Sequence, residues 1–129
     1  TDNNSNVTFT FSEKVSDATF AGLASGAGIT VAGGTLSALT WNAGHTAATA
    51  TFTATDASET AGSVTVDAGY TDVAGNLGTS GTDTVTIDTL NPSVIVNIVD
   101  GALSDTDNNS NVTFTFSEKV SDATFAGLA

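Results

Sequence analysis

The sequence predicts an all-β fold, a sandwich of about seven short antiparallel strands. Several segments alternate apolar and polar residues with a period of two, as half-buried strands do. Gly, Asn, Asp and Ser cluster between these segments, where they favour turns. The chain also repeats itself, because residues 1–24 and 106–129 are identical.

The longer strands are expected where the alternation is clearest, at residues 6–15, 46–55, 62–72, 82–88 and 93–100. Shorter strand candidates lie at 17–20, 28–34 and 35–41. No segment has a convincing helical period, so we expect no helix. The aromatic residues that fall in strands are the expected core: Phe9, Phe11, Trp41, Phe52 and Tyr70.

The repeat determines the predicted domain organisation. Its period of 105 residues is too long for a solenoid repeat and matches a whole small domain. We therefore expect a longer parent array that is cut out of phase here. Residues 1–90 then form one sandwich that lacks its first strand, and residues 91–129 are the first strands of the next identical repeat. Pro92 is placed at the start of a strand, where a missing N–H is tolerated.

The composition limits the partners. Fourteen acidic residues oppose two lysines, which gives a formal net charge of −12. This sign excludes binding to nucleic acid and to anionic lipid. Nothing in the sequence resembles a membrane span, so no membrane insertion is expected. The chain has no cysteine, so its core or a bound metal must stabilise it in place of disulfides.

Three motifs carry a resemblance to a known family. They are VTFTFSEKV at 7–15, YTDVAGN at 70–76 and DTVTIDTLNPSV at 83–94. In this order and spacing they resemble the bacterial immunoglobulin-like repeats of giant surface adhesins, which leave the cell by type I secretion. The resemblance implies an immunoglobulin-like sandwich that extends a calcium-stiffened stalk at the bacterial cell surface, for adhesion or biofilm formation.

The acidic loops are the candidate calcium sites, because calcium takes six to eight oxygen ligands in irregular geometry. One end of the predicted sandwich combines its own loops with the linker of the preceding repeat, and offers Glu13, Asp17, Asp72, Asn76 and Asp88. The other end offers Asp100, Asp105 and Asp107, with Asp56 and Glu59 in a neighbouring loop. Asp and Asn also cap backbone groups in turns without any ion, and this alternative stays open.

The expected function is structural and not enzymatic. His45 stands alone without a second His or a Cys, which argues against a zinc site and a Ser–His–Asp triad. The expected partners are neighbouring identical repeats. Two alternatives remain, a module that binds a carbohydrate or a host protein, and an accessory domain of a secreted enzyme. The identical tandem repeat favours the stalk.

The missing first strand leads to one more expectation. Residues 1–90 should leave a sheet edge uncovered, and exposed edges recruit strands. Residues 93–100 of a neighbouring molecule have the fitting sequence, so we expect head-to-tail strand exchange between chains. The two identical 24-residue copies would then compete for one place beside that strand.

Overall fold

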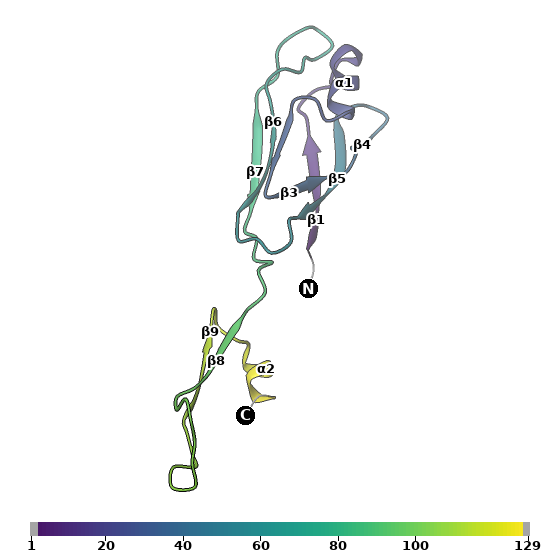
Figure 1. Cartoon of the computed structure of the whole chain (residues 1–129). Helices are drawn as coiled ribbons and strands as arrows, with labels where there is room; N and C mark the ends of the chain where they lie inside the picture. The colour runs from purple at the N-terminus through teal and green to yellow at the C-terminus, as the bar shows by residue number, and fades with distance from the viewer. Residues whose placement is uncertain (1–2, 128–129) are drawn as a thin grey trace. The chain divides into compact units, whose positions relative to one another are not determined.

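The computed structural model describes residues 3–127. The chain divides into two compact units, Thr1–Leu90 and Asn91–Ala129. The first unit contains strands β1 to β7 and helix α1, and the second contains β8, β9 and α2 (Figure 1). Among the described residues, no helix is both long and apolar enough to cross a membrane.

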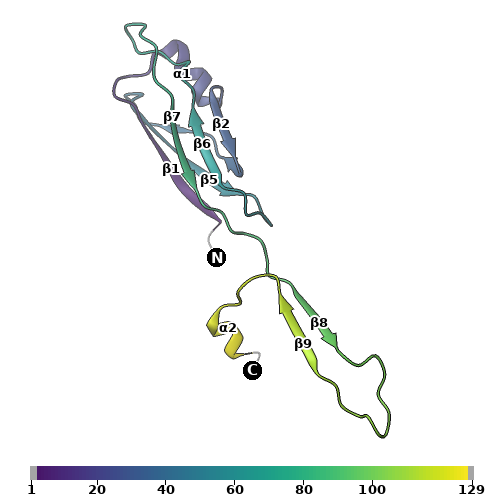
Figure 2. The ribbon, with the colours of Figure 1, turned by 90° about the vertical axis from the view of Figure 1, so that its left-hand side faces the viewer.

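Two antiparallel sheets form the first unit (Figure 2). The first sheet consists, in spatial order, of β1 (Asn4–Thr10), β5 (Ala47–Ala54) and β3 (Gly34–Leu36), with β4 (Thr40–Trp41) also paired to β5. The second sheet consists of β2 (Ile29–Ala32), β6 (Gly62–Val66) and β7 (Gly81–Val85). β1 and β7 are therefore edge strands of their sheets.

Alternating side chains build the core between these sheets. On β5, Ala48, Ala50 and Phe52 are buried, while Thr49 between them is exposed. Of the aromatic residues predicted for the core, Phe9 and Phe52 are buried, and the other three are half-buried against it. Among the residues whose burial is described, the buried apolar residues are Phe9, Val15, Leu23, Ala48, Ala50, Phe52, Val64, Val66 and Ile87. The all-β prediction is confirmed.

The prediction of a strand at residues 17–20, and of no helix, was wrong. Helix α1 spans Asp17–Ala24. Ser16 precedes it in extended backbone, and the negative charge of Asp17 in the first turn is favourable beside the helix N-terminus. Phe20 and Leu23, three residues apart, lie on one face of the helix and pack against the core.

A glycine ends α1. Gly26 has a φ of +86°, a conformation that glycine adopts at no steric cost. The N–H of Gly26 donates to the Leu23 carbonyl and that of Ala27 to the Gly22 carbonyl, both at 2.9 Å. This pair of bonds is a Schellman cap, which satisfies the last carbonyls of the helix.

The second unit is a single hairpin followed by a short helix. β8 (Val94–Ile98) pairs antiparallel with β9 (Val112–Phe116), and α2 spans Asp122–Ala126. α2 lies in the repeated segment and begins 105 residues after α1, so the prediction of no helix was wrong here as well. The apolar side chains of both strands are exposed, with Val96 at 55% and Phe114 at 61%.

Candidate functional sites

One end of the sandwich is held together by backbone bonds. After β1 the chain reaches Val15, whose N–H donates to the His45 carbonyl at 3.0 Å and which pairs with Asp72 in an isolated bridge. The N–H of Ser16 donates to the Thr71 carbonyl at 2.9 Å. Val15 is only 1% exposed. The start of α1 is thus fixed between two loops that are distant in sequence.

Asp72 organises the loop that contains it. Its Oδ1 accepts the N–H of Asn76 and its Oδ2 accepts the Nδ2 of Asn76, both at 2.8 Å. Gly75, with a φ of +89°, makes the tight reversal between them. These bonds, the Asn76 side chain foremost, lower the pKa of Asp72 below its usual value. The carboxylate is therefore charged and keeps lone pairs for another ligand.

The other two predicted residues at this end have different surroundings. Glu13 lines the same surface depression as Asp72 and Asn76. Asp17 does not line this depression, since it is the first residue of helix α1. Its Oδ1 lies 3.5 Å from the Lys14 Nζ and 3.4 Å from the His45 Nδ1.

Asp88 lies at the far end of the first unit, directly after the buried Ile87, and is exposed. The next residue, Thr89, attaches the chain there. The Thr89 Oγ1 donates to the Thr55 carbonyl at 2.7 Å and accepts the Ser58 N–H at 3.1 Å. The Thr89 N–H donates to the Ser58 carbonyl at 2.9 Å. The exit of the chain from this unit is therefore well defined.

The remaining candidates, Asp100, Asp105 and Asp107, are exposed in the loop between β8 and β9. Hydroxyl groups order parts of this loop, since the N–H of Asp100 donates to Ser110 Oγ at 2.9 Å. Within residues 3–127, no three His, Cys, Asp or Glu side chains form a group that could hold a metal ion. Calcium binding by these residues stays a prediction.

An aromatic cluster that sequence reasoning missed joins α1 to the turn between β4 and β5. The rings of Phe20 and His45 stack with centroids 3.8 Å apart and planes 6° apart. Trp41 packs edge-on against Phe20 at 5.0 Å and stacks on Phe11 at 5.3 Å. The Trp41 Nε1 is buried and makes no hydrogen bond. The cluster could have been predicted only if helix α1, which brings Phe20 to His45, had been predicted.

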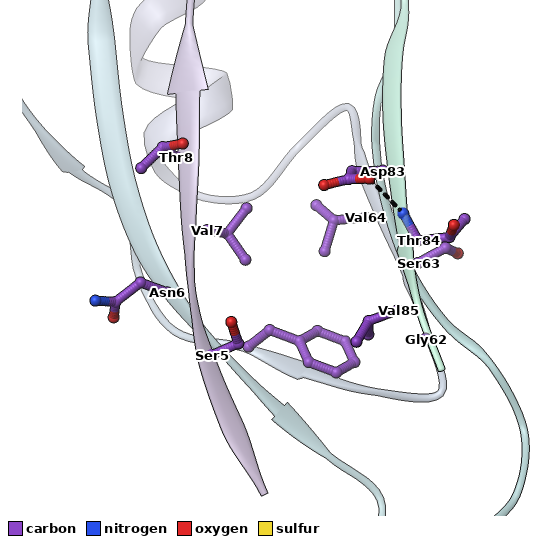
Figure 3. Close-up of a pocket in the computed structure, with 11 residues that line it drawn as sticks. Ser5, Asn6, Val7, Thr8, Gly62, Ser63, Val64, Asp83, Thr84 and Val85 are labelled. Carbon is purple, nitrogen blue, oxygen red and sulfur yellow. Dashed lines mark hydrogen bonds between the residues drawn. The ribbon is translucent and has the colours of Figure 1, made fainter. Parts of the chain in front are cut away.

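A groove runs between the edge strands β1 and β7. The groove consists of two adjoining pockets, which share the lining residues Val7, Thr8 and Asp83. In one pocket β1 faces Val64 and Val85, and in the other it faces residues 79–83. Figure 3 shows Val7 and Val64 facing one another across the gap between the sheets. The sandwich is thus open along this side.

Two facing antiparallel sheets connected by short turns define an immunoglobulin-like β-sandwich. The chain belongs to the bacterial Ig-like domain family, whose model matches residues 1–89. Domains of this family are generally structural modules, typical of extracellular and surface proteins. No curated protein and no solved structure matches the chain.

Proposed function

We propose that this chain is part of the stalk of a bacterial surface adhesin, in which each repeat acts as an extender. The observation that carries the proposal is the identity of residues 1–24 and 106–129 in a bacterial Ig-like chain. Identical modules in series add length without adding a new binding specificity. A chain built to bind several ligands has no such reason to keep its repeats identical.

The path of the chain through the first unit supports an end-to-end arrangement. Gly62 pairs with Val85 at one end of the second sheet, and Val66 pairs with Gly81 at the other. The loop of Asp72 connects β6 to β7 at the Val66 end, whereas the chain leaves through Thr89 at the opposite end. In the proposed stalk, the exit of one repeat would lie near the Asp72 loop of the next.

Charge supplies the proposed mechanism. Residues 1–105 contain eleven acidic residues against the single Lys14, so neighbouring repeats repel one another over a screening length of about 8 Å at physiological salt. We infer that calcium binds where repeats meet and replaces this repulsion with shared coordination. Asp72, Asn76 and Glu13 offer oxygen ligands around one depression. Extracellular modules bind calcium at about 10⁻⁴ to 10⁻³ M, near its extracellular concentration.

The test is a calcium titration of the full chain followed by thermal melting. We expect a higher melting temperature in millimolar calcium, because ions that bind only the folded form stabilise it. Magnesium at equal ionic strength is the control, since it demands stricter geometry. Coincident melting curves in calcium and in chelator would rule out the calcium mechanism.

A pair of substitutions tests the depression itself. Glu13→Ala and Asp72→Ala should each weaken calcium binding, and their effects on affinity should be strongly non-additive if one ion contacts both. Calcium affinity by calorimetry is the required readout, because Asp72→Ala also removes two hydrogen bonds from its loop. Asp67→Ala removes the same charge outside the depression and is the matched control. Additive effects would indicate two separate sites.

A further inference from the structure

The hydrogen bonds at both ends of the β1–β5 ladder identify which edge of β1 is in use. Phe11 N–H donates to the Thr46 carbonyl at 2.9 Å, and Ala54 N–H donates to the Asn3 carbonyl at 2.8 Å. Backbone groups of successive residues point to opposite edges of an antiparallel strand. The odd-numbered residues of β1 therefore face β5. The residues whose backbone groups face the opposite edge include Asn6, Thr8 and Thr10.

The second copy of the same sequence uses the other edge. Val99 N–H donates to the Asn111 carbonyl at 2.9 Å, and Ser117 N–H donates to the Ser93 carbonyl at 3.0 Å. By the same alternation, the β9 residues that face β8 are Asn111, Thr113, Thr115 and Ser117. Their equivalents 105 residues earlier are Asn6, Thr8, Thr10 and Ser12. β8 thus pairs with one edge of β9. Among the described residues, no strand pairs with the equivalent edge of β1.

The same correspondence gives the register. Val96 lies opposite Phe114 in the hairpin, so it would lie opposite Phe9 on β1. Val94 would lie opposite Phe11, and Ile98 opposite Val7. Side chains opposite one another share a face of the sheet. The three apolar side chains of β8 would therefore enter the groove between β1 and β7, whose walls include Val7, Val64 and Val85 (Figure 3).

The β8 strand of the same chain is too close to the exit to reach this position. Thr89 is bonded to Thr55, next to the Ala54–Asn3 bond, so it lies at the Asn3 end of β1. Phe11 is eight residues further along, about 26 Å at about 3.3 Å per residue. Val94 follows Thr89 by five residues, which span at most about 18 Å. The strand must come from another molecule.

We propose that the groove between β1 and β7 binds β8 of a second copy of this chain, which releases its own β9 in exchange. The exchange replaces the backbone hydrogen bonds between β8 and β9 with the same number between β8 and β1, because the β1 residues are identical to those of β9. The burial of the side chains differs between the two pairings. Val94, Val96 and Ile98 are 47%, 55% and 59% exposed in the hairpin, and the groove would cover them. This burial is the driving force for the exchange.

Charge opposes the association and sets the conditions for its test. Each chain carries a net charge of −12, so association should strengthen as salt screens the repulsion. No carboxylate takes part in the proposed strand pairing, so calcium is not required. Sedimentation of the full chain in chelator and moderate salt, over a concentration series, should show associated species. This result is independent of the proposed stalk function. Monomers alone at every concentration would overturn the proposal.

Two substitutions in β8 separate strand donation from non-specific association. Val96→Asp places a charge on the face that enters the groove and should abolish association. Ile95→Asp places the same charge on the opposite face of the same strand, at a side chain that is 69% exposed, and should preserve it. Both residues are exposed in the hairpin, so the first unit should fold in either variant. Equal behaviour of the two variants would contradict the proposal.

A cross-link tests the register. The chain has no cysteine, so Thr8→Cys and Asn97→Cys can be introduced in separate chains and mixed. The proposed pairing places these residues directly opposite, about 5.5 Å apart between Cα atoms, which a disulfide can span. Val99→Cys, two residues further along the same face, is the control. We expect a disulfide-linked dimer with residue 97 and not with residue 99. The reverse pattern would overturn the proposed register.

Discussion

The two copies of one 24-residue sequence have different surroundings in the same molecule. In the first copy, Phe9 is 8% exposed inside a sandwich, and in the second copy its equivalent Phe114 is 61% exposed on a hairpin. Both copies form a strand followed by a helix that begins at equivalent positions, Asp17 and Asp122. Local sequence therefore determines the elements, whereas burial depends on the strands available to cover them.

The copies also differ in the edge that they use. β1 pairs with β5, and β9 pairs with β8 through the opposite edge. One strand sequence thus has two specific edges, each suited to a different neighbour. In this chain each copy pairs through one of these edges, β1 with β5 and β9 with β8.

The largest expected effect concerns the matched phenylalanines. Phe9→Ala should lower the free energy of unfolding of the first unit by about 3–5 kcal/mol, the usual cost of such a cavity in a core. Phe114→Ala removes the same atoms from the same local sequence at an exposed position, and should change it by less than about 0.5 kcal/mol. Urea denaturation at low protein concentration, where chains are not associated, measures both.

Similar effects of the two substitutions would contradict the comparison. They would mean that the second copy is as well covered as the first. A loss confined to Phe9→Ala would establish that the burial of the side chain, and not its local sequence, determines its contribution.

The elements of the fold were largely predictable because most strands alternate strictly. β5 lies within the predicted strand 46–55, and β6 within 62–72, although β6 ends at Val66. The alternation beyond Val66 belongs to a turn and loop, which a period of two does not distinguish from a strand. Helix α1 was missed because residues 17–20, its first four residues, were interpreted as a short strand. Ser16 before it, Asp17 in its first turn and Gly26 after it were the signals that define it.

The sites were predictable only where they are local in sequence. Asp72 and Asn76 lie four residues apart in one loop, so their contact could be expected. Asp17 was expected beside them, but the helix that begins there places it near Lys14 and His45. That β1 would pair with a single strand in the described part of the chain could be expected from the repeat. Which backbone groups face the other edge could not, since this depends on the pairing with β5.

The next prediction concerns how the stability of the first unit depends on acidic pH. The loop of Asp72 holds Val15 and Ser16 of the first copy. Hydrogen bonds to Asn76 lower the pKa of Asp72 from its ordinary value of 3.8. Its stabilising contribution is therefore complete above that value and is lost as the pH falls through the folded pKa. Asp72→Asn should make unfolding less dependent on pH below 4, as urea titrations at pH 6 and 3 would measure.

The smallest effect concerns the equivalent aspartates, which form the same surface pair in both copies. The Asp17 Oδ1 lies 3.5 Å from the Lys14 Nζ, and the Asp122 Oδ1 lies 3.9 Å from the Lys119 Nζ. Exposed pairs of this kind contribute up to about 1 kcal/mol. Asp17 has His45 as a further neighbour at 3.4 Å, and its charge lies at the first turn of a helix that packs on the core.

We therefore expect Asp17→Asn to lower the free energy of unfolding by less than about 1 kcal/mol, and Asp122→Asn to leave it nearly unchanged. Both values should fall toward zero in about 1 M salt, where the screening length is about 3 Å. Melting curves at low and high salt measure the difference. An equal effect of the two substitutions would mean that only the ion pair with lysine, which both copies form, contributes to stability. A larger effect of Asp17→Asn that persists in high salt would assign its role to packing around α1 instead of charge.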